Sequence, residues 1–397
     1  MKIFQLLLVV TVIPHNSPVE LPLANANDIN ISLGDIQVNQ SISDITRGLV
    51  QAYGNELSAD YFFNFVSNLV LRFSTQFGTV VTNNICAAIT AENGIKANPE
   101  DIPDVEDISI QLRTACNIKE YPLKQLPNII NDPDFDVNKR VVIASGWLTN
   151  ANKSDDMLDG LGKAFNCRGD TNFLGIDVGR YIQTLYSWSL LNTTRIGEIL
   201  AIALVDLTKT LPVENFHLMG HSLGAQIVGE AARQYNRLTG EKIPRVTGFD
   251  PAGSCINYDQ RLITITASDA SYVDIIHTNP SLVGQAIPTG DVDFFVGSGF
   301  SVKNSSLDST CSQHHPFRYY VESVYPGNEY NFPAKRCDSL LHLSQGRCVG
   351  PEVPMGYAPP MYLEGLFMVD IDSKKSFDRN ASSSYISPNS ECGACPN

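Results

Sequence analysis

The chain has 397 residues, of which 43% are hydrophobic and 18% are charged. This is enough for one large globular domain with an extension, or for two modest domains. A formal net charge of −14 argues against a nucleic-acid partner, because an acidic surface repels phosphate groups. A neutral or interfacial substrate fits this charge better.

The N-terminus predicts secretion. Lys2 is followed by an apolar run at 3–13, which is too short to span a bilayer and is typical of a signal peptide. The small residues at 24–26 offer a cleavage site, so we assign residues 1–26 to a signal peptide. No later stretch is long and apolar enough for a transmembrane helix, and we expect an extracellular protein without a membrane span.

Sequons and cysteines agree with an oxidising, extracellular compartment. The nine cysteines are an odd number, so at least one is free or pairs with another chain. We predict a disulfide between Cys337 and Cys348, and we interpret the pair Cys392 and Cys395 as a tail clip or a flexible end rather than a redox motif. Glycosylation is predicted at Asn30, Asn39, Asn152, Asn192, Asn304 and Asn380.

Residues 27–105 are predicted to form a helical extension that ends in a linker. The pattern is helical between residues 41 and 91, and residues 94–107 contain the proline and acidic residues typical of a boundary. We expect the apolar and aromatic stretch at 61–71 to be a helix packed on the main domain. The alternative is a helix that contacts lipid or belongs to a pro-segment.

Residues 106–375 are predicted to form one α/β domain, because short apolar strands alternate with helices, as in a mostly parallel sheet. The segment 376–397 is rich in serine and asparagine and is expected to be a flexible tail. Strands are expected at 108–112, 140–146, 173–177, 216–219, 245–250, 272–277 and 292–295, and helices at 195–210 and 225–238.

The pattern G-x-S-x-G occurs as Gly220-His221-Ser222-Leu223-Gly224. An apolar strand precedes it and a helix follows it, which is the context of a nucleophile elbow. In such an elbow the serine lies on a strained turn, and the glycines let the strand and the helix pack closely. We therefore predict that Ser222 is a nucleophile.

A serine hydroxyl needs a base to take its proton, and the base is normally a histidine oriented by a carboxylate. In α/β hydrolases the order along the chain is serine, acid, histidine. Asp250 ends the strand that follows the elbow helix, where a side chain points into the crevice at the sheet edge. We predict that Asp250 is the orienting acid.

These motifs, together with the segments 268–278, 292–295 and 355–357, resemble the pancreatic lipase family, and most closely its insect secreted branch that includes yolk proteins. The resemblance covers about residues 106–372. It implies an α/β-hydrolase fold without the C-terminal β-sandwich of vertebrate lipases. It also implies cleavage of lipid acyl esters without a cofactor, except in relatives such as yolk proteins that have lost the catalytic machinery.

The resemblance assigns the remaining roles. Ser222 is the nucleophile, Asp250 the acid, and the backbone N–H groups of Leu223 and Trp147 form the oxyanion hole. The family's calcium ligands would fall where this chain has Arg261, Thr264 and Thr266, so no metal is expected. The lid would lie between residues 299 and 311, with the apolar side chains Phe300, Val302 and Leu307.

The base is the point at which this chain departs from the family. Aligned without a gap, the histidine position falls on Gln313, which cannot exchange a proton near neutral pH. His314 is the next residue, in a loop before a helix, where a shift by one position is feasible. We therefore predict His314 as the base. Loss of the base in a serine protease costs about 10⁶-fold in turnover.

Two functions follow. The first is a secreted ester hydrolase that uses Ser222, Asp250 and His314 on a lipid or other acyl ester, including esters held at an interface. The alternative is a catalytically impaired lipase homologue that binds lipid or a small apolar ligand, or serves as a yolk-like storage protein. Gln313 and the missing first cysteine of a lid clamp favour the alternative.

Overall fold

The computed structural model describes residues 102–146, 156–182, 186–253, 264–278, 285, 287–297, 316–369, 386 and 388–396. Several predictions lie outside these residues: the signal peptide, most of the extension, the lid, Trp147, Gln313, His314 and every sequon except Asn192. In the described part of the chain, no helix is long and apolar enough to cross a bilayer.

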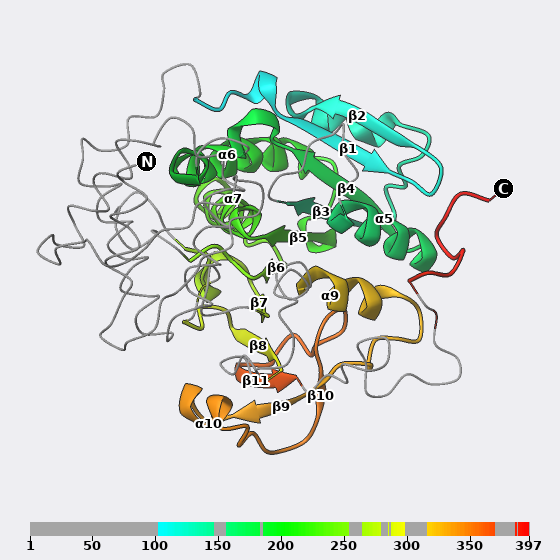
Figure 1. Ribbon diagram of the computed structural model, residues 1–397. Helices are drawn as coiled ribbons and strands as arrows, with labels where there is room; N and C mark the ends of the chain where they lie inside the picture. The colour runs from blue at the N-terminus through cyan, green and yellow to red at the C-terminus, as the bar shows by residue number, and fades with distance from the viewer. Residues whose placement is uncertain are drawn as a thin grey trace, which may run out of the picture.

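An 11-stranded sheet forms the centre of the molecule, with the order β10-β9-β11-β8-β7-β6-β5-β3-β4-β1-β2 (Figure 1). From β4 through β3, β5, β6, β7 and β8 to β11, every neighbouring pair is parallel, whereas the pairs at both ends are antiparallel. The predicted mostly parallel sheet is therefore confirmed. The strands are β1 (Ser109–Arg113), β2 (Ile118–Pro122), β3 (Arg140–Ser145), β4 (Thr171–Asp177), β5 (Phe216–His221), β6 (Arg245–Phe249), β7 (Val273–His277), β8 (Val292–Val296), β9 (Pro333–Cys337), β10 (Val353–Pro354) and β11 (Gly365–Val369).

Helices cover both faces of the sheet, as the connections between parallel strands require. In Figure 1, α6 and α7 lie on one side, and α5 and α9 on the other. The helices are α5 (Asp156–Arg168), α6 (Tyr186–Leu207), α7 (Leu223–Thr239), α9 (Pro316–Val324) and α10 (Leu340–Ser344). The 3₁₀ helices are η3 (Val105–Asp107), η4 (Leu123–Asn131), η5 (Gly179–Ile182), η6 (Val213–Asn215) and η8 (Ala267–Asp269).

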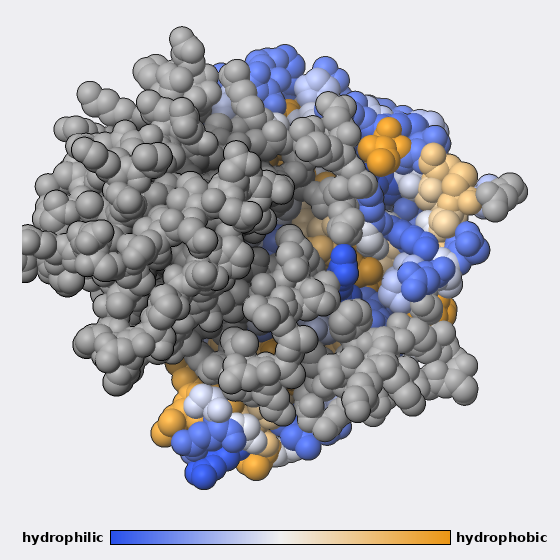
Figure 2. Space-filling view, viewed as in Figure 1, coloured by the Kyte–Doolittle hydropathy of each residue, from blue (hydrophilic) through white to orange (hydrophobic). Residues whose placement is uncertain are grey.

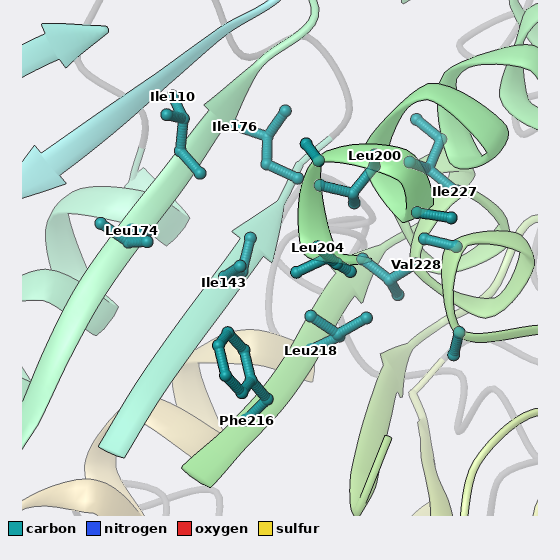
Figure 3. Packing of buried hydrophobic residues seen from close by; sticks show 14 of the residues in the cluster. Ile110, Ile143, Leu174, Ile176, Leu200, Leu204, Phe216, Leu218, Ile227 and Val228 are labelled. Carbon is teal, nitrogen blue, oxygen red and sulfur yellow. The ribbon is translucent and has the colours of Figure 1, made fainter. Parts of the chain in front are cut away.

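The strands are apolar on both faces because each face packs on helices. In β3, Ile143 belongs to the core under α6 and α7, whereas the neighbouring Val142 belongs to the core under α5 and α9. Figure 3 shows the first of these cores, with Leu204 of α6 and Val228 of α7 over Leu218 of β5 (Figure 3). These two cores hold the ends of β5 and β6 in fixed positions.

The outer strand β2 marks the edge of the sheet. Its residues alternate between exposed and half-buried, as expected for a strand that faces water on one side. On the face shown in Figure 2, the described surface around β1, β2 and α5 is mostly hydrophilic with isolated apolar side chains (Figure 2).

The described end of the chain is not the flexible tail that the composition predicted. Disulfides join Cys116 to Cys395 and Cys167 to Cys392, so the tail is attached to the β1–β2 turn and to α5. A Cβ atom on Gly393 would lie 2.0 Å from the carbonyl oxygen of Lys163, which shows how closely the tail backbone approaches α5. The two cysteines of the C-x-x-C motif therefore form a clip.

A further disulfide in the described part of the chain joins Cys337 to Cys348, the pair expected from the sequence. The sequon at Asn192 is different. Asn192 lies inside α6 with 4% of its surface exposed, and its amide donates to the carbonyl oxygen of Tyr181 at 3.3 Å. A glycan has no room there, so the glycosylation prediction is wrong for Asn192 in the folded protein.

Candidate active site

Ser222 occupies the sharp turn between β5 and α7. Its φ of 54° and ψ of −118° are unfavourable for a residue with a side chain, and this strain is typical of functional turns. Two backbone hydrogen bonds hold the turn: Ser222 N–H donates to the oxygen of Phe249 at 2.9 Å, and Ala252 N–H donates to the oxygen of Ser222 at 3.1 Å. The serine is thereby fixed at the carboxyl end of the central strand.

Steric constraints explain why the motif has glycine at positions 220 and 224. A Cβ atom on Gly220 would lie 2.2 Å from the carbonyl oxygen of Gly224. A Cβ atom on Gly224 would lie 2.1 Å from the carbonyl oxygen of Ser145, at the end of β3. Both distances exclude any side chain, so close packing of β3, β5 and α7 around Ser222 requires glycine at both positions.

Asp250 lies beside this turn, directly after β6. The register pairs His221 of β5 with Phe249 of β6, so the residues that follow, Ser222 and Asp250, lie at the same level of the sheet. Asp250 also has a positive φ, of 38°, and only 8% of its surface is exposed. The structure thus brings together two of the three residues predicted for the triad.

Thr278 holds the carboxylate of Asp250. Its backbone N–H donates to Oδ1 at 2.7 Å, and its hydroxyl donates to Oδ2 in a short hydrogen bond. Hydrogen bonds to an ionised acceptor are stronger than those between neutral groups. Sequence reasoning missed Thr278, because its role depends on the pairing of β6 with β7.

Gln226 ties the acid-bearing turn to the elbow helix. Its side-chain amide donates to the oxygen of Ala252 at 2.7 Å, and its Oε1 accepts from the N–H of Ile265 at 2.8 Å. Gln226 is 3% exposed and lies one helical turn after Ser222. The buried amide therefore holds both described ends of the segment that follows Asp250. The helical spacing from Ser222 was the available signal for this residue.

One predicted oxyanion donor is described. Leu223 begins α7, and the first N–H groups of a helix have no partner within the helix. They also lie at the positive end of the helix dipole, where a developing negative charge is stabilised. The other predicted donor, Trp147, follows β3 but lies outside the described residues.

The acidic residues near this site do not fit a calcium site. Asp269 accepts from Arg233 through both oxygens, at 2.9 and 2.8 Å, and Arg233 also pairs with Glu230. Thr264 and Thr266 bring no carboxylate. Within the described part of the chain, no group of three histidine, cysteine or acidic side chains could hold a metal ion.

Comparisons with known proteins agree with this geometry. A family model described as Lipase matches residues 73–362. Vitellogenin-3 from Drosophila melanogaster is 31% identical over 272 residues, which cover 66% of this chain and 61% of the relative. Pancreatic lipase-related protein 2 from Cavia porcellus is 28% identical over 282 residues, covering 64% of each chain.

A third relative, phospholipase A1 from Vespa velutina, is 31% identical over 214 residues, covering 49% of this chain and 68% of the relative. The chain spans 48% to 61% of the length of the vitellogenins that it matches. The relatives therefore include both lipases and vitellogenins. The matched family model covers the elbow, the acid-bearing turn and every strand of the sheet except β11. The chain belongs to the lipase family, and its relatives place it in the insect yolk-protein-like branch of the pancreatic lipase group.

Proposed function

We propose that this protein is a secreted carboxylic ester hydrolase that cleaves lipid acyl esters through an acyl-enzyme on Ser222. The observation that carries the proposal is the strained elbow, which holds Ser222 level with the buried carboxylate of Asp250. Relatives named as lipases and as phospholipase A1 support ester hydrolysis as the reaction class.

In this mechanism the Ser222 hydroxyl attacks the acyl carbonyl and gives its proton to the base, His314. The carbonyl oxygen becomes an oxyanion, which accepts hydrogen bonds from the N–H groups of Leu223 and Trp147. The protonated base then gives its proton to the leaving alcohol. A water molecule attacks the acyl-enzyme by the same route and regenerates the serine. Asp250 orients the base throughout.

The alternative is a catalytically impaired homologue that binds lipid or serves as a storage protein. In an alignment without a gap, Gln313 falls at the position where the resemblance expects the family's histidine. The vitellogenin relatives are the second observation that favours this alternative. Under this hypothesis, the elbow and the acid-bearing turn remain as parts of the fold.

The experiment that separates the two is hydrolysis of a short-chain chromogenic ester by the purified secreted protein. Three variants are measured beside the wild type: Ser222→Ala, His314→Ala and Gln313→His. If the wild type turns over and both alanine variants lose activity by several orders of magnitude, the hydrolase proposal stands with His314 as the base.

A wild type that equals Ser222→Ala contradicts the hydrolase proposal. If Gln313→His then gains activity, the remaining machinery is intact and the native protein is an inactive homologue. Circular dichroism of each variant checks that it is folded.

A further inference from the structure

Both side-chain oxygens of the acid in the proposed triad accept hydrogen bonds from one neighbouring residue, Thr278. Thr278 donates to both oxygens of the Asp250 carboxylate, one bond from its backbone N–H at 2.7 Å and one from its hydroxyl. A carboxylate oxygen has two lone pairs, so each oxygen can still accept a second hydrogen bond. The two bonds from Thr278 therefore fix the direction of the Asp250 carboxylate.

The backbone of Asp250 makes this support necessary. A φ of 38° is costly for a residue with a Cβ atom, and such residues stay in place only where the surroundings hold them. One support is the hydrogen bond from Asp250 N–H to the oxygen of Ile276 at 2.9 Å. Thr278 provides the support at the other end of the residue, on the side chain.

Thr278 is itself held by the residue before it. His277 is fully buried at the end of β7, and its Nε2 lies 2.7 Å from Oδ1 of Asp293. Its ring stacks on Phe295 with 4.3 Å between ring centroids and an interplanar angle of 11°. Asp293 accepts a further bond from the N–H of Gly290 at 3.0 Å. These contacts therefore hold His277, the last residue of β7, and with it the position of Thr278, the next residue along the chain.

We propose that Thr278 is a positioning residue that aims the carboxylate of Asp250 at the base, and that the His277–Asp293 pair anchors it. This inference rests on the proposed ester hydrolase function. Thr278 does not touch the reacting atoms. It acts by restricting Asp250 to one orientation, so its loss lowers the turnover number and leaves substrate binding unchanged.

The test compares two substitutions of Thr278 in the full chain with a chromogenic ester. Thr278→Val keeps the shape and removes the hydroxyl, whereas Thr278→Ser keeps the hydroxyl. We expect kcat of Thr278→Val to fall about 10- to 100-fold, the value of one hydrogen bond to a charged group, with KM within about twofold. Thr278→Ser should stay within about threefold of the wild type.

Thr289→Val is the matched control, because the buried Thr289 hydroxyl has no hydrogen-bond partner within the described part of the chain. Its kcat should equal that of the wild type. The inference is overturned if the wild type is active and Thr278→Val equals it. An equal fall of kcat in Thr278→Val and Thr278→Ser also overturns the inference, because the loss of activity would then not come from removal of the hydroxyl.

An inactive wild type would be a failure of the proposed function, and it is recognised before any variant is compared. The two Thr278 variants are then measured in a Gln313→His background, where the same loss and rescue would support the positioning role. If this background is also inactive, the positioning role falls together with the function. Thermal unfolding of Thr278→Val, Asp250→Asn and the double variant then shows whether the contact contributes to stability. If it does, the change in unfolding free energy of the double variant differs from the sum of the two single changes.

Discussion

The two edges of the parallel sheet are built in different ways. At the carboxyl edge, Ser222 and Asp250 are the two non-glycine residues with positive φ among the described residues. At the amino edge, Arg245 and Asp274 form a buried ion pair with ordinary backbone angles. Backbone strain is thus found where chemistry is proposed, and a hydrogen-bonded ion pair holds the opposite edge.

The amino edge is a connected polar network. The Nε and Nη2 atoms of Arg245 donate to the two oxygens of Asp274 at 2.9 and 2.7 Å, and Thr247 donates to Oδ1 of Asp274 at 2.8 Å. Arg245 also donates to the carbonyl oxygen of Tyr357 at 2.8 Å. Burial opposes the charge of Arg245, but the negative charge of Asp274 raises the pKa of the guanidinium above its ordinary value. This network joins β6 and β7 to the segment before β11.

The largest expected change in stability comes from breaking this pair. Arg245→Met leaves the carboxylate of Asp274 buried without its partner, and we expect the free energy of unfolding to fall by about 3–5 kcal/mol. The rate of ester hydrolysis per folded molecule should stay within about twofold, because the carboxyl edge is not touched. Urea unfolding and active-site-normalised kinetics measure the two quantities.

Arg195→Met is the matched control for that substitution. Arg195 pairs with Glu198 at 3.1 Å on the exposed side of α6, where an ion pair contributes at most about 1 kcal/mol. Equal losses of stability in Arg195→Met and Arg245→Met would contradict the role given to the amino edge.

The second expected effect concerns the elbow. Gly224→Ala places a methyl group against the Ser145 carbonyl oxygen, and we expect a loss of about 1–3 kcal/mol in unfolding free energy from overpacking. The rise in the activation free energy calculated from kcat should exceed this loss of unfolding free energy, because the clash displaces α7 and with it the N–H of Leu223. Thermal unfolding and kcat of the same preparation test this.

Gly162→Ala on α5 provides the comparison. A Cβ atom there would lie 3.4 Å from the ring of Phe173, an ordinary contact, and alanine in a helix is favoured over glycine by about 1 kcal/mol. Gly162→Ala should therefore be neutral or stabilising and leave kcat unchanged. If Gly224→Ala also leaves the unfolding free energy and kcat unchanged, the elbow can accommodate a methyl group, and the steric requirement for glycine is contradicted.

The smallest effect is a pH dependence at the amino edge. Burial, then the positive charges of Arg245 and Arg140, lower the pKa of His217 well below its usual range, and its Nε2 lies 2.8 Å from Oγ1 of Thr247. Below about pH 6.5 the unfolded chain takes up a proton at His217 that the folded protein does not. Stability must therefore fall as the pH falls below 6.5, by up to about 1.4 kcal/mol per unit from this residue.

His217→Gln should remove this part of the slope. We expect the unfolding free energy of the variant to change less between pH 6.5 and 5 than that of the wild type. Identical slopes in urea titrations at the two pH values would contradict the assignment to His217.

The carboxyl edge was predictable from the sequence because its signals are local. The spacing of Gly220, Ser222 and Gly224 encodes the elbow, and the chain order places Asp250 after the next strand. Alternating apolar strands and helices likewise predicted the parallel centre of the sheet. These features depend on neighbouring residues and on the order of elements.

Features that join distant segments could not be predicted in this way. The pairing of Cys392 with Cys167 spans 225 residues, and spacing alone does not determine connectivity. The support of Asp250 by Thr278 requires the register of β6 and β7, and the antiparallel addition of β9 beside β11 requires knowledge of which edges are free. Tertiary contacts decide all three.

We propose that the strained carboxyl edge of the sheet makes Ser222 a reactive nucleophile. The reactivity of Ser222 is tested most directly by reaction with diethyl p-nitrophenyl phosphate, followed by peptide mass spectrometry. We expect one diethylphosphoryl group on Ser222, release of one p-nitrophenolate per chain, and no adduct in Ser222→Ala. An unmodified Ser222 in a folded protein at saturating reagent would contradict it.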